Sequence, residues 1–348
     1  MSTPFRRYRT VRAKSNWFSF HIEKRPIWLM LGLLVGTLLL FVLALSVGST
    51  WISPKLVLQT LLGQSSEFTF IIETLRLPRA IVALAAGAAL GVSGAILQGV
   101  VRNPLASPGI IGITGGAGVA AVAFLVYFNA SISIRFLPLS AVLGAALVAL
   151  LIYVLAWKKG VSPIRLVLIG VGIQACMQAL TIMMIMFSPM HLAGQAYIWL
   201  TGSVYGADWL DVSLLLPWII IFIPLAWMST RHLNLQELGD DTTTGLGSKL
   251  QLQRCILLAI SVVLAGAAVS VAGTIGFVGL LAPHIARRLA GRSYGYVIPT
   301  AAFIGGLIVL AADIVGRTIY MPHDIPAGVF ISGIGAPFFM YLLLKNKF

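Results

Sequence analysis

The chain has 348 residues, of which 59% are hydrophobic and only 10% are charged, and its formal net charge is +14. A soluble domain of this length carries about a quarter charged residues, so the polar surface would be too small to keep this chain dissolved. Composition therefore excludes a soluble globular protein and predicts one with many membrane spans.

The first 25 residues form a strongly basic segment ahead of the first apolar run. They contain seven Lys or Arg residues and a single acid, Glu23. This segment and the apolar run after it are both too long for an ordinary cleaved signal peptide. We expect residues 1–26 to form a cytoplasmic tail whose charge contacts anionic lipid. Nucleic acid is not an expected partner, because the tail contains no recognisable reading module.

Apolar runs of membrane-spanning length follow along the rest of the chain. A helix needs roughly 20 apolar residues to cross about 30 Å of hydrocarbon. The strict alternation of a membrane barrel, with strands of about ten residues, is lacking. We therefore predict an all-α membrane protein with a single transmembrane domain at 27–348. About ten helices are expected, over 27–47, 80–100, 111–128, 138–157, 166–187, 212–228, 255–271, 274–287, 297–315 and 327–344.

Glycine is abundant within these runs, with 35 residues in the chain. Pairs four residues apart, such as Gly87 and Gly91, or Gly112 and Gly116, are typical of close helix contacts in lipid. We interpret them as packing positions and assign them no functional role.

The distribution of Lys and Arg predicts the orientation, because cytoplasmic loops carry the excess of basic residues. With the N-terminus inside and ten spans, the C-terminus is inside as well, and nineteen of the 24 Lys and Arg residues face the cytoplasm. Five are expected on the opposite side: Lys55, Arg76, Arg79, Arg135 and Arg317.

Motifs for chemistry on this chain are missing. The sequence contains no H-E-x-x-H zinc motif, no G-x-S-x-G nucleophile motif and no G-x-x-x-x-G-K-[ST] phosphate loop. The histidines are scattered, so we predict no metal site, and neither Cys176 nor Cys255 suggests a disulfide. We expect no enzyme activity and no cofactor on this chain, so any ATP hydrolysis belongs to a partner chain.

Ionisable residues are nearly absent from the predicted spans, although ion-coupled carriers usually bury them. Asp313 and Arg317 are exceptions near the outer end of the ninth span, four residues apart on one helical face, where they could pair. Four methionines in the fifth span suit a weakly binding lining, but a lipid-facing or filler role is favoured. A secondary carrier, which would work without ATP, is therefore less favoured than a transporter that draws its energy from an ATPase on a partner chain.

The longest polar loop, at about 231–254, is a candidate for receiving energy from a partner. Its leucines are separated by glycines that act as stops or turns. A pair of short amphipathic helices could therefore dock on a cytoplasmic protein. A solvated connecting loop explains the same pattern equally well, and the loop alone leaves both interpretations open.

An ordered series of short motifs carries a family resemblance. The motifs are RLPR at 76–79, SGAILQ at 93–98, RNPLA at 102–106, L-G-(x)6-L-G at 238–247, GFVGLLAPHIAR at 276–287, ADIVGR at 312–317, IPAG at 325–328 and GAPFF at 335–339. No single motif is decisive, but together they resemble the permease family of ABC importers for iron–siderophores, haem and vitamin B12. The resemblance covers roughly residues 30–345.

The resemblance implies a ten-span permease of type II importer architecture that pairs with a second permease subunit, identical or homologous. Two ATPase subunits, which bind ATP and Mg, would sit beneath it at the cytoplasmic (inner) membrane. An extracytoplasmic binding protein would deliver the cargo from above. An iron–siderophore complex is the expected cargo, because such systems are the commonest members of the family; vitamin B12 and haem stay open.

The resemblance also implies docking residues. Arg76, Arg79 and Arg317 match the family arginines that receive acidic residues of the binding protein, and such charge pairs mainly guide docking. The alternatives are contact with lipid phosphates or internal pairing, as of Arg317 with Asp313. The family's Glu before x-Pro-x-Gly is Asp324 in this chain, which weakens inferences about its local contacts.

The polar loop matches the family's coupling segment, which inserts into a cleft of the ATPase. Two leucines would supply apolar contacts, and three acids could contact basic residues of the ATPase. The coupling candidates are Leu235, Glu237, Leu238, Gly239, Asp240, Asp241, Gly245, Leu246 and Gly247.

Two proline-containing turns are candidates for the inner gate, namely Asn103 with Pro104 and Pro283 with His284. We expect them to end the second and eighth spans at the cytoplasmic side. Proline removes a backbone donor and disfavours helix in the residue before it. Plain helix termination explains both turns at least as well as gating does.

Overall fold

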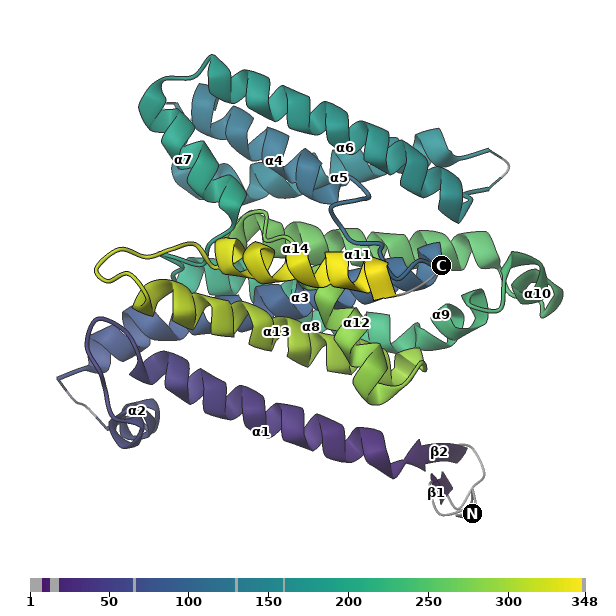
Figure 1. Cartoon of the computed structure of the whole chain (residues 1–348), viewed down its shortest axis with the longest axis horizontal. Helices are drawn as coiled ribbons and strands as arrows, with labels where there is room; N and C mark the ends of the chain where they lie inside the picture. Colours follow the sequence, from purple (N-terminus) through teal and green to yellow (C-terminus); the bar gives the residue numbers. More distant parts are fainter. Residues whose placement is uncertain (1–7, 13–18, 65–66, 129–130, 159, 346–348) are drawn as a thin grey trace.

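The computed structural model describes residues 8–12, 19–64, 67–128, 131–158 and 160–345, which form a bundle of helices along one axis (Figure 1). The long helices are α1 (Lys24–Ser46), α3 (Leu77–Val101), α5 (Leu137–Ala156), α6 (Pro163–Met186), α8 (Trp209–Met228), α11 (Leu250–Ala272), α13 (Tyr294–Thr318) and α14 (Ala327–Lys345). The shorter elements are α2 (Pro54–Leu61), η2 (Ile71–Arg76), α4 (Ile113–Ala123), η3 (Phe124–Phe128), η4 (Ile134–Phe136), α7 (Met190–Thr201), α9 (Thr230–Gln236), α10 (Asp240–Gly245) and α12 (Val278–Ala290).

The helical membrane fold is confirmed. Within the described residues, seven helices are long and apolar enough to cross a membrane, and Ile113–Phe128 and Ala327–Tyr341 are shorter apolar helices. These nine helices coincide with nine of the ten predicted spans. Sequence patterning did not predict α7, which lies between the fifth and sixth spans.

The predicted eighth span, 274–287, is wrong in its extent. α11 ends at Ala272, and α12 begins only at Val278 and has 13 residues. A helix of that length is about 20 Å long, which is shorter than the hydrocarbon core. Phe277 has a left-handed backbone with φ of 61°. The non-helical α11–α12 connection is held by the bundle itself, because the Thr274 hydroxyl donates to the carbonyl of Leu200.

The N-terminal region contains a two-stranded hairpin that was not predicted. β1 (Tyr8–Arg12) pairs antiparallel with β2 (Ser19–Glu23), and α1 follows directly. The sequence of β2, SFHIE, alternates polar and apolar residues, which is a signal for a strand. The other residues of the predicted tail at 1–7 and 13–18 lie outside the described residues.

α3 is the central helix of the bundle. Most of its residues are buried, and it packs against α13, α11 and α12. A Cβ on Gly87 would overlap the carbonyl oxygen of Gly305, and one on Gly91 would overlap that of Ala301. The packing role of this glycine pair is therefore confirmed, because small residues let helix backbones approach closely where no hydrophobic effect drives association.

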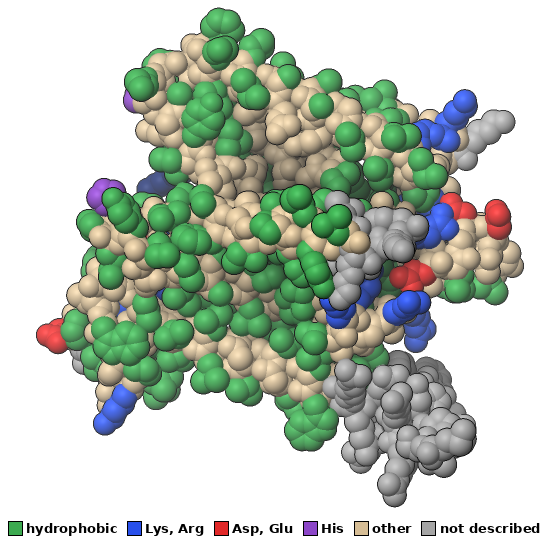
Figure 2. Space-filling model, in the orientation of Figure 1, with side chains coloured by type: hydrophobic (Ala, Val, Ile, Leu, Met, Phe, Trp, Pro, Cys, Tyr) green, Lys and Arg blue, Asp and Glu red, His purple; other side chains and the backbone are tan. Residues whose placement is uncertain are grey.

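The two ends of the bundle carry different elements. β1, β2, α9, α10 and the C-terminal end of α14 lie toward one end, called the α10 end below. α2, η2 and the α13–α14 connection lie toward the other, called the α2 end (Figure 1). Figure 2 shows hydrophobic side chains along the sides of the bundle and Lys and Arg side chains gathered at the α10 end. Apolar sides between charged ends are what a lipid bilayer requires.

Candidate functional site

Two of the three predicted docking arginines cap the end of α1. Arg76 Nη1 donates to the carbonyls of Leu45 and Ser46 at 2.8 and 3.0 Å, and Arg317 Nη2 donates to the carbonyl of Ala44 at 2.7 Å. These carbonyls belong to the last turn of α1 and have no partner within that helix. Arg76 and Arg317 are each only 6% exposed. Both cations therefore stabilise the packing of α1 at the α2 end.

The third arginine, Arg79, lies between two carboxylates. Its Nε and Nη2 donate to Asp313 Oδ1 at 2.9 and 2.8 Å, and its Nη1 donates to Asp324 Oδ2 at 2.6 Å. Its guanidinium also stacks 5.5 Å from the ring centre of Tyr205. Asp313 is buried with 3% of its side chain exposed, whereas Asp324 is 21% exposed. Of the two carboxylates, Asp324 is thus the one that solvent or a partner can reach.

Internal pairing is the alternative interpretation that the structure supports for these arginines. Arg317 Nε lies 3.7 Å from Asp313 Oδ2, as the four-residue spacing suggested. The stronger pairing of Arg79 with Asp313 was missed, because the two residues are 234 positions apart. The three arginines do lie together at the α2 end, and direct docking on them stays a prediction.

The predicted coupling segment forms two short helices at the α10 end. Leu238 and Leu246 are 59% and 63% exposed at the turns that follow α9 and α10. Glu237 and Asp241 are also exposed, whereas Leu235 is half-buried. Their surroundings leave the two leucines free to contact another protein. Of the three candidate glycines, Gly245 and Gly247 are exposed and Gly239 is half-buried.

Asp240 differs from the other acids of this segment, because it forms ion pairs with two arginines of the same chain. Its Oδ1 lies 3.0 Å from both Arg102 Nη2 and Arg254 Nη2. Arg254 is buried at 1% exposure and also donates to the carbonyl of Val161. Asp240 therefore ties α10 to the end of α3 and to the start of α11. Its expected contact with the ATPase would have to compete with these two ion pairs.

The first pair of gate candidates does end a helix. α3 ends at Val101, Arg102 has a left-handed backbone with φ of 55°, and Asn103 Oδ1 accepts from the amide of Leu105 at 2.9 Å. Pro104 follows in this turn. The turn places Arg102 beside α10, so the end of the central helix and the coupling segment are in contact.

The second pair of gate candidates does not end a helix. Pro283 and His284 lie inside α12, which continues to Ala290, so the expected turn at this position is wrong. Pro283 has no amide hydrogen to donate to the carbonyl of Gly279, four residues earlier in α12, so the helix continues without that one internal hydrogen bond. The His284 ring lies edge-on to Phe338 of α14, 5.9 Å between centres. Among the described residues, no group of three or more His, Cys, Asp or Glu could hold a metal ion.

A polar pocket between α4, α6 and α7 was missed. Gln174, Gln178 and Thr181 line it from α6, and Tyr197 and Thr201 line it from α7. Its volume is about 370 Å³. The signal for it was present in the sequence, since Gln174, Gln178 and Thr181 follow the i, i+4, i+7 spacing of one helix face. A search for ionisable residues passes over them because all three are neutral.

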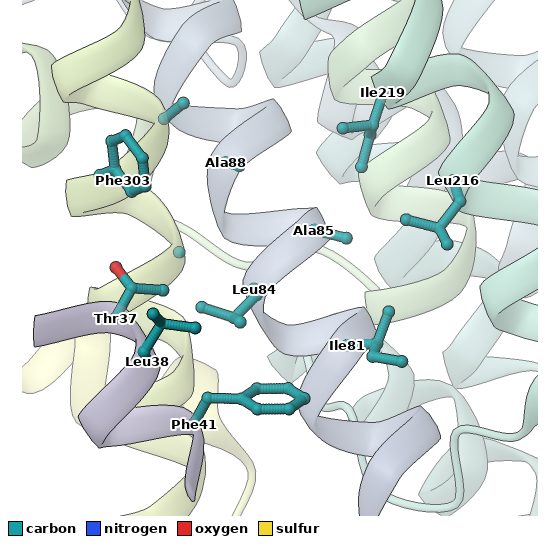
Figure 3. A pocket seen from close by; sticks show the side chains of 12 residues that line it. Thr37, Leu38, Phe41, Ile81, Leu84, Ala85, Ala88, Leu216, Ile219 and Phe303 are labelled. Atoms are coloured by element: carbon teal, nitrogen blue, oxygen red, sulfur yellow. The ribbon is translucent and has the colours of Figure 1, made fainter. Parts of the chain in front are cut away.

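A second cavity has the opposite character. It measures about 470 Å³ and lies between α1, α3, α8 and α13, where Phe41, Leu84, Leu216 and Phe303 line it (Figure 3). Its one hydroxyl, that of Thr37, is already bonded to the carbonyl of Leu33. The lining offers nothing to a polar cargo and suits a lipid acyl chain.

The arrangement is that of a multi-pass helical membrane protein, with exposed leucines at one end and a polar pocket among its helices. The chain belongs to the FecCD transport family, which it matches over residues 36–345. It is 46% identical over 337 residues to YfhA of Bacillus subtilis, which is named a probable siderophore transport system permease protein; the match covers 95% of this chain and 98% of that protein. The achromobactin transport system permease protein CbrC of Dickeya dadantii is 46% identical over 315 residues, with 90% of each chain covered.

Solved structures agree with this assignment. A metal-chelate type ABC transporter solved in an inward-facing conformation superposes with a TM-score of 0.81 at 28% identity. The match covers 92% of this chain and 100% of that one. The chain therefore has the helical architecture of a type II ABC importer permease.

Proposed function

We propose that the chain is the permease of an ABC importer that carries an iron–siderophore complex across the cytoplasmic membrane. The observation that carries the proposal is the near-full-length identity of 46% to permeases named for siderophore and achromobactin transport. A permease named for Fe(3+)-citrate import, at 46% identity over 322 residues, supports the same cargo class. Vitamin B12 or haem is the alternative cargo within this architecture.

The α10 end is the proposed contact with the ATPase subunits, which would bind ATP and Mg. Exposed Leu238 and Leu246 offer the apolar contacts, and the sequence contains no phosphate loop of its own. The same end carries both described ends of the chain and the gathered Lys and Arg side chains, so we place it in the cytoplasm by the positive-inside rule. A second permease, identical or homologous, would cover part of the exposed apolar sides. Residues 1–26 are proposed as a basic tail and 27–348 as one permease domain.

Transport assays test the cargo and the energy source together. The permease is reconstituted in liposomes with its ATPase and binding protein, and labelled ferric siderophore, vitamin B12 and haem are offered in turn. We expect uptake of the ferric siderophore, and only when ATP and the ATPase are present. Uptake of vitamin B12 or haem alone would favour the alternative cargo. Uptake without the ATPase, driven by an ion gradient, would contradict the ABC mechanism.

The α2 end is the proposed docking surface for the binding protein, with Arg79 as its contact residue. Arg76 and Arg317 are occupied by the carbonyls of α1, whereas one partner of Arg79, Asp324, is accessible. An acidic residue of the binding protein could replace Asp324 at Arg79 Nη1 while Asp313 stays in place. Charge pairs of this kind guide orientation and association more than they add affinity.

Asp324→Asn is the sharp test of this docking contact. Removing the competing carboxylate is expected to raise the affinity for the binding protein up to about fivefold, which corresponds to the free energy that one partly exposed ion pair contributes. Adding Arg79→Gln to Asp324→Asn should reverse the gain. The measurement is a titration of binding protein onto the permease complex in nanodiscs. Unchanged or weaker binding by Asp324→Asn would rule out Arg79 as the docking residue.

A further inference from the structure

The polar pocket between α4, α6 and α7 places neutral hydrogen-bonding groups at membrane depth. Gln174, Gln178 and Thr181 form one face of α6, a helix whose other positions are mainly apolar. Burying an amide without a partner costs free energy in hydrocarbon. Such groups are therefore expected inside a membrane only where they meet other polar groups, water or a ligand.

The protein satisfies some of these groups and leaves others available. The Thr181 hydroxyl donates to the carbonyl of Met177 at 2.9 Å, and the Thr201 hydroxyl donates to that of Tyr197 at 2.6 Å. By contrast, Gln174 Oε1 is buried without a hydrogen-bond partner among the described residues. Gln178 is exposed. The amides of α6 are thus the groups that a ligand could engage.

The pocket is shaped for Gln174 by a glycine on the facing helix. A Cβ on Gly115 of α4 would overlap the Gln174 side-chain oxygen. The wall made by α7 is also held in place, because the amide of Ser203 donates to the carbonyl of Ala272 at 2.9 Å, and that of Gly328 donates to the carbonyl of Gly202 at 3.0 Å. The pocket is therefore preorganised and does not result from a loose end of the chain.

The pocket is lined by neutral groups only. None of its lining residues is charged, and its volume of about 370 Å³ is within the range of small-ligand sites. Figure 2 shows a hollow between the layer that contains α6 and α7 and the part that contains α14. Amides and hydroxyls can bond the oxygen atoms of a ligand without holding it as strongly as a charge would.

We propose that this pocket is a cargo-contact site, where the amide nitrogens of Gln174 and Gln178 donate to oxygen atoms on the outer surface of a metal chelate during its passage, and Gln174 Oε1 accepts from N–H or O–H groups of the same ligand. The inference rests on the proposed function, since it names the part of the permease that touches the cargo. A neutral site tolerates chelates of different net charge, and its weak bonds allow release toward the other side.

The test replaces the two amides by leucine, Gln174→Leu with Gln178→Leu, in the full complex with its ATPase and binding protein. Uptake of radioactive iron into liposomes is measured with ferric citrate and with a ferric trihydroxamate as probes. We expect uptake to fall about tenfold or more, the loss from two hydrogen bonds, with binding-protein-stimulated ATP hydrolysis retained. Met183→Leu, an exposed position on α6 outside the pocket, is the matched control and should transport normally.

A second variant distinguishes a lost contact with the cargo from a defect in folding. Gly115→Ala keeps both amides but displaces Gln174, so it should also lower uptake without lowering ATP hydrolysis. Normal uptake by the double leucine variant would overturn the proposal. Loss of uptake together with loss of the assembled complex on size-exclusion chromatography would also overturn it, because the amides would then serve subunit packing. Failure of the unmodified complex to transport either probe would instead contradict the proposed function.

Discussion

Replacing Leu238 and Gly239 together by alanine is expected to abolish uptake while ATP hydrolysis continues. Leu238 is 59% exposed, so its truncation should lower the stability of the isolated permease only slightly. The main effect is expected on the contact with the ATPase. Gly239 has φ of 102° and ψ of 159°, a backbone region open essentially to glycine alone. Alanine there adds strain of about 1–3 kcal/mol. The start of α10 would shift, and with it the ion pairs that Asp240 makes.

Uptake and ATP hydrolysis measured on one preparation check this prediction. Leu252→Ala is the matched control, because Leu252 is 56% exposed on α11 near the same end but outside the segment. The control should transport normally. Full transport by a stable Leu238→Ala, Gly239→Ala variant would show that α9 and α10 are a connecting loop without a coupling role.

Asp313→Ala is expected to destabilise the permease by about 3–5 kcal/mol, the usual cost of removing one partner from a buried ion pair. Asp313 is 2% exposed and is the shared counter-charge of Arg79 and Arg317. Without it, the buried Arg317 and the half-buried Arg79 would face each other, and only the more exposed Asp324 would be left to pair with Arg79. Arg317 would then be drawn away from the carbonyl of Ala44, and α1 would lose part of its attachment.

Thermal unfolding of the purified permease in detergent measures this effect. Glu67→Gln removes an exposed acid of the chain and should leave the unfolding temperature unchanged. An unchanged unfolding temperature for Asp313→Ala would show that the two arginines do not depend on this carboxylate. In that case the capping of α1 would account for the burial of Arg317, and the ion pair with Asp324 would account for the placement of Arg79.

The sequence predicts most of the helices because insertion into a membrane depends on the composition of each segment by itself. The segment at 274–287 is the exception, since its residues are apolar enough for a span. Its helix starts late because Thr274 bonds Leu200 of α7, a helix that patterning did not predict. Contacts between two segments thus override the composition of one.

The candidate sites were less predictable than the spans. The sequence identifies the exposed leucines of the coupling segment and the cluster of arginines at the α2 end. It does not show that Asp240 is bound by Arg102 and Arg254, because these residues meet only after α3, α10 and α11 pack. The amides at Gln174 and Gln178 could have been found from their helical spacing, but not the pocket that α4 and α7 complete around them.

The amino-acid sequence by itself determines that this chain is a multi-span helical membrane protein of the FecCD family, because hydrophobic runs and ordered motifs are local properties. It also predicts which basic residues share an end of the bundle. Only the tertiary structure decides that Arg76 and Arg317 cap α1 and that Arg79 is held by Asp313. The physical reason is that hydrogen bonds and ion pairs form over about 3 Å, a distance set by helix packing and not by position in the chain.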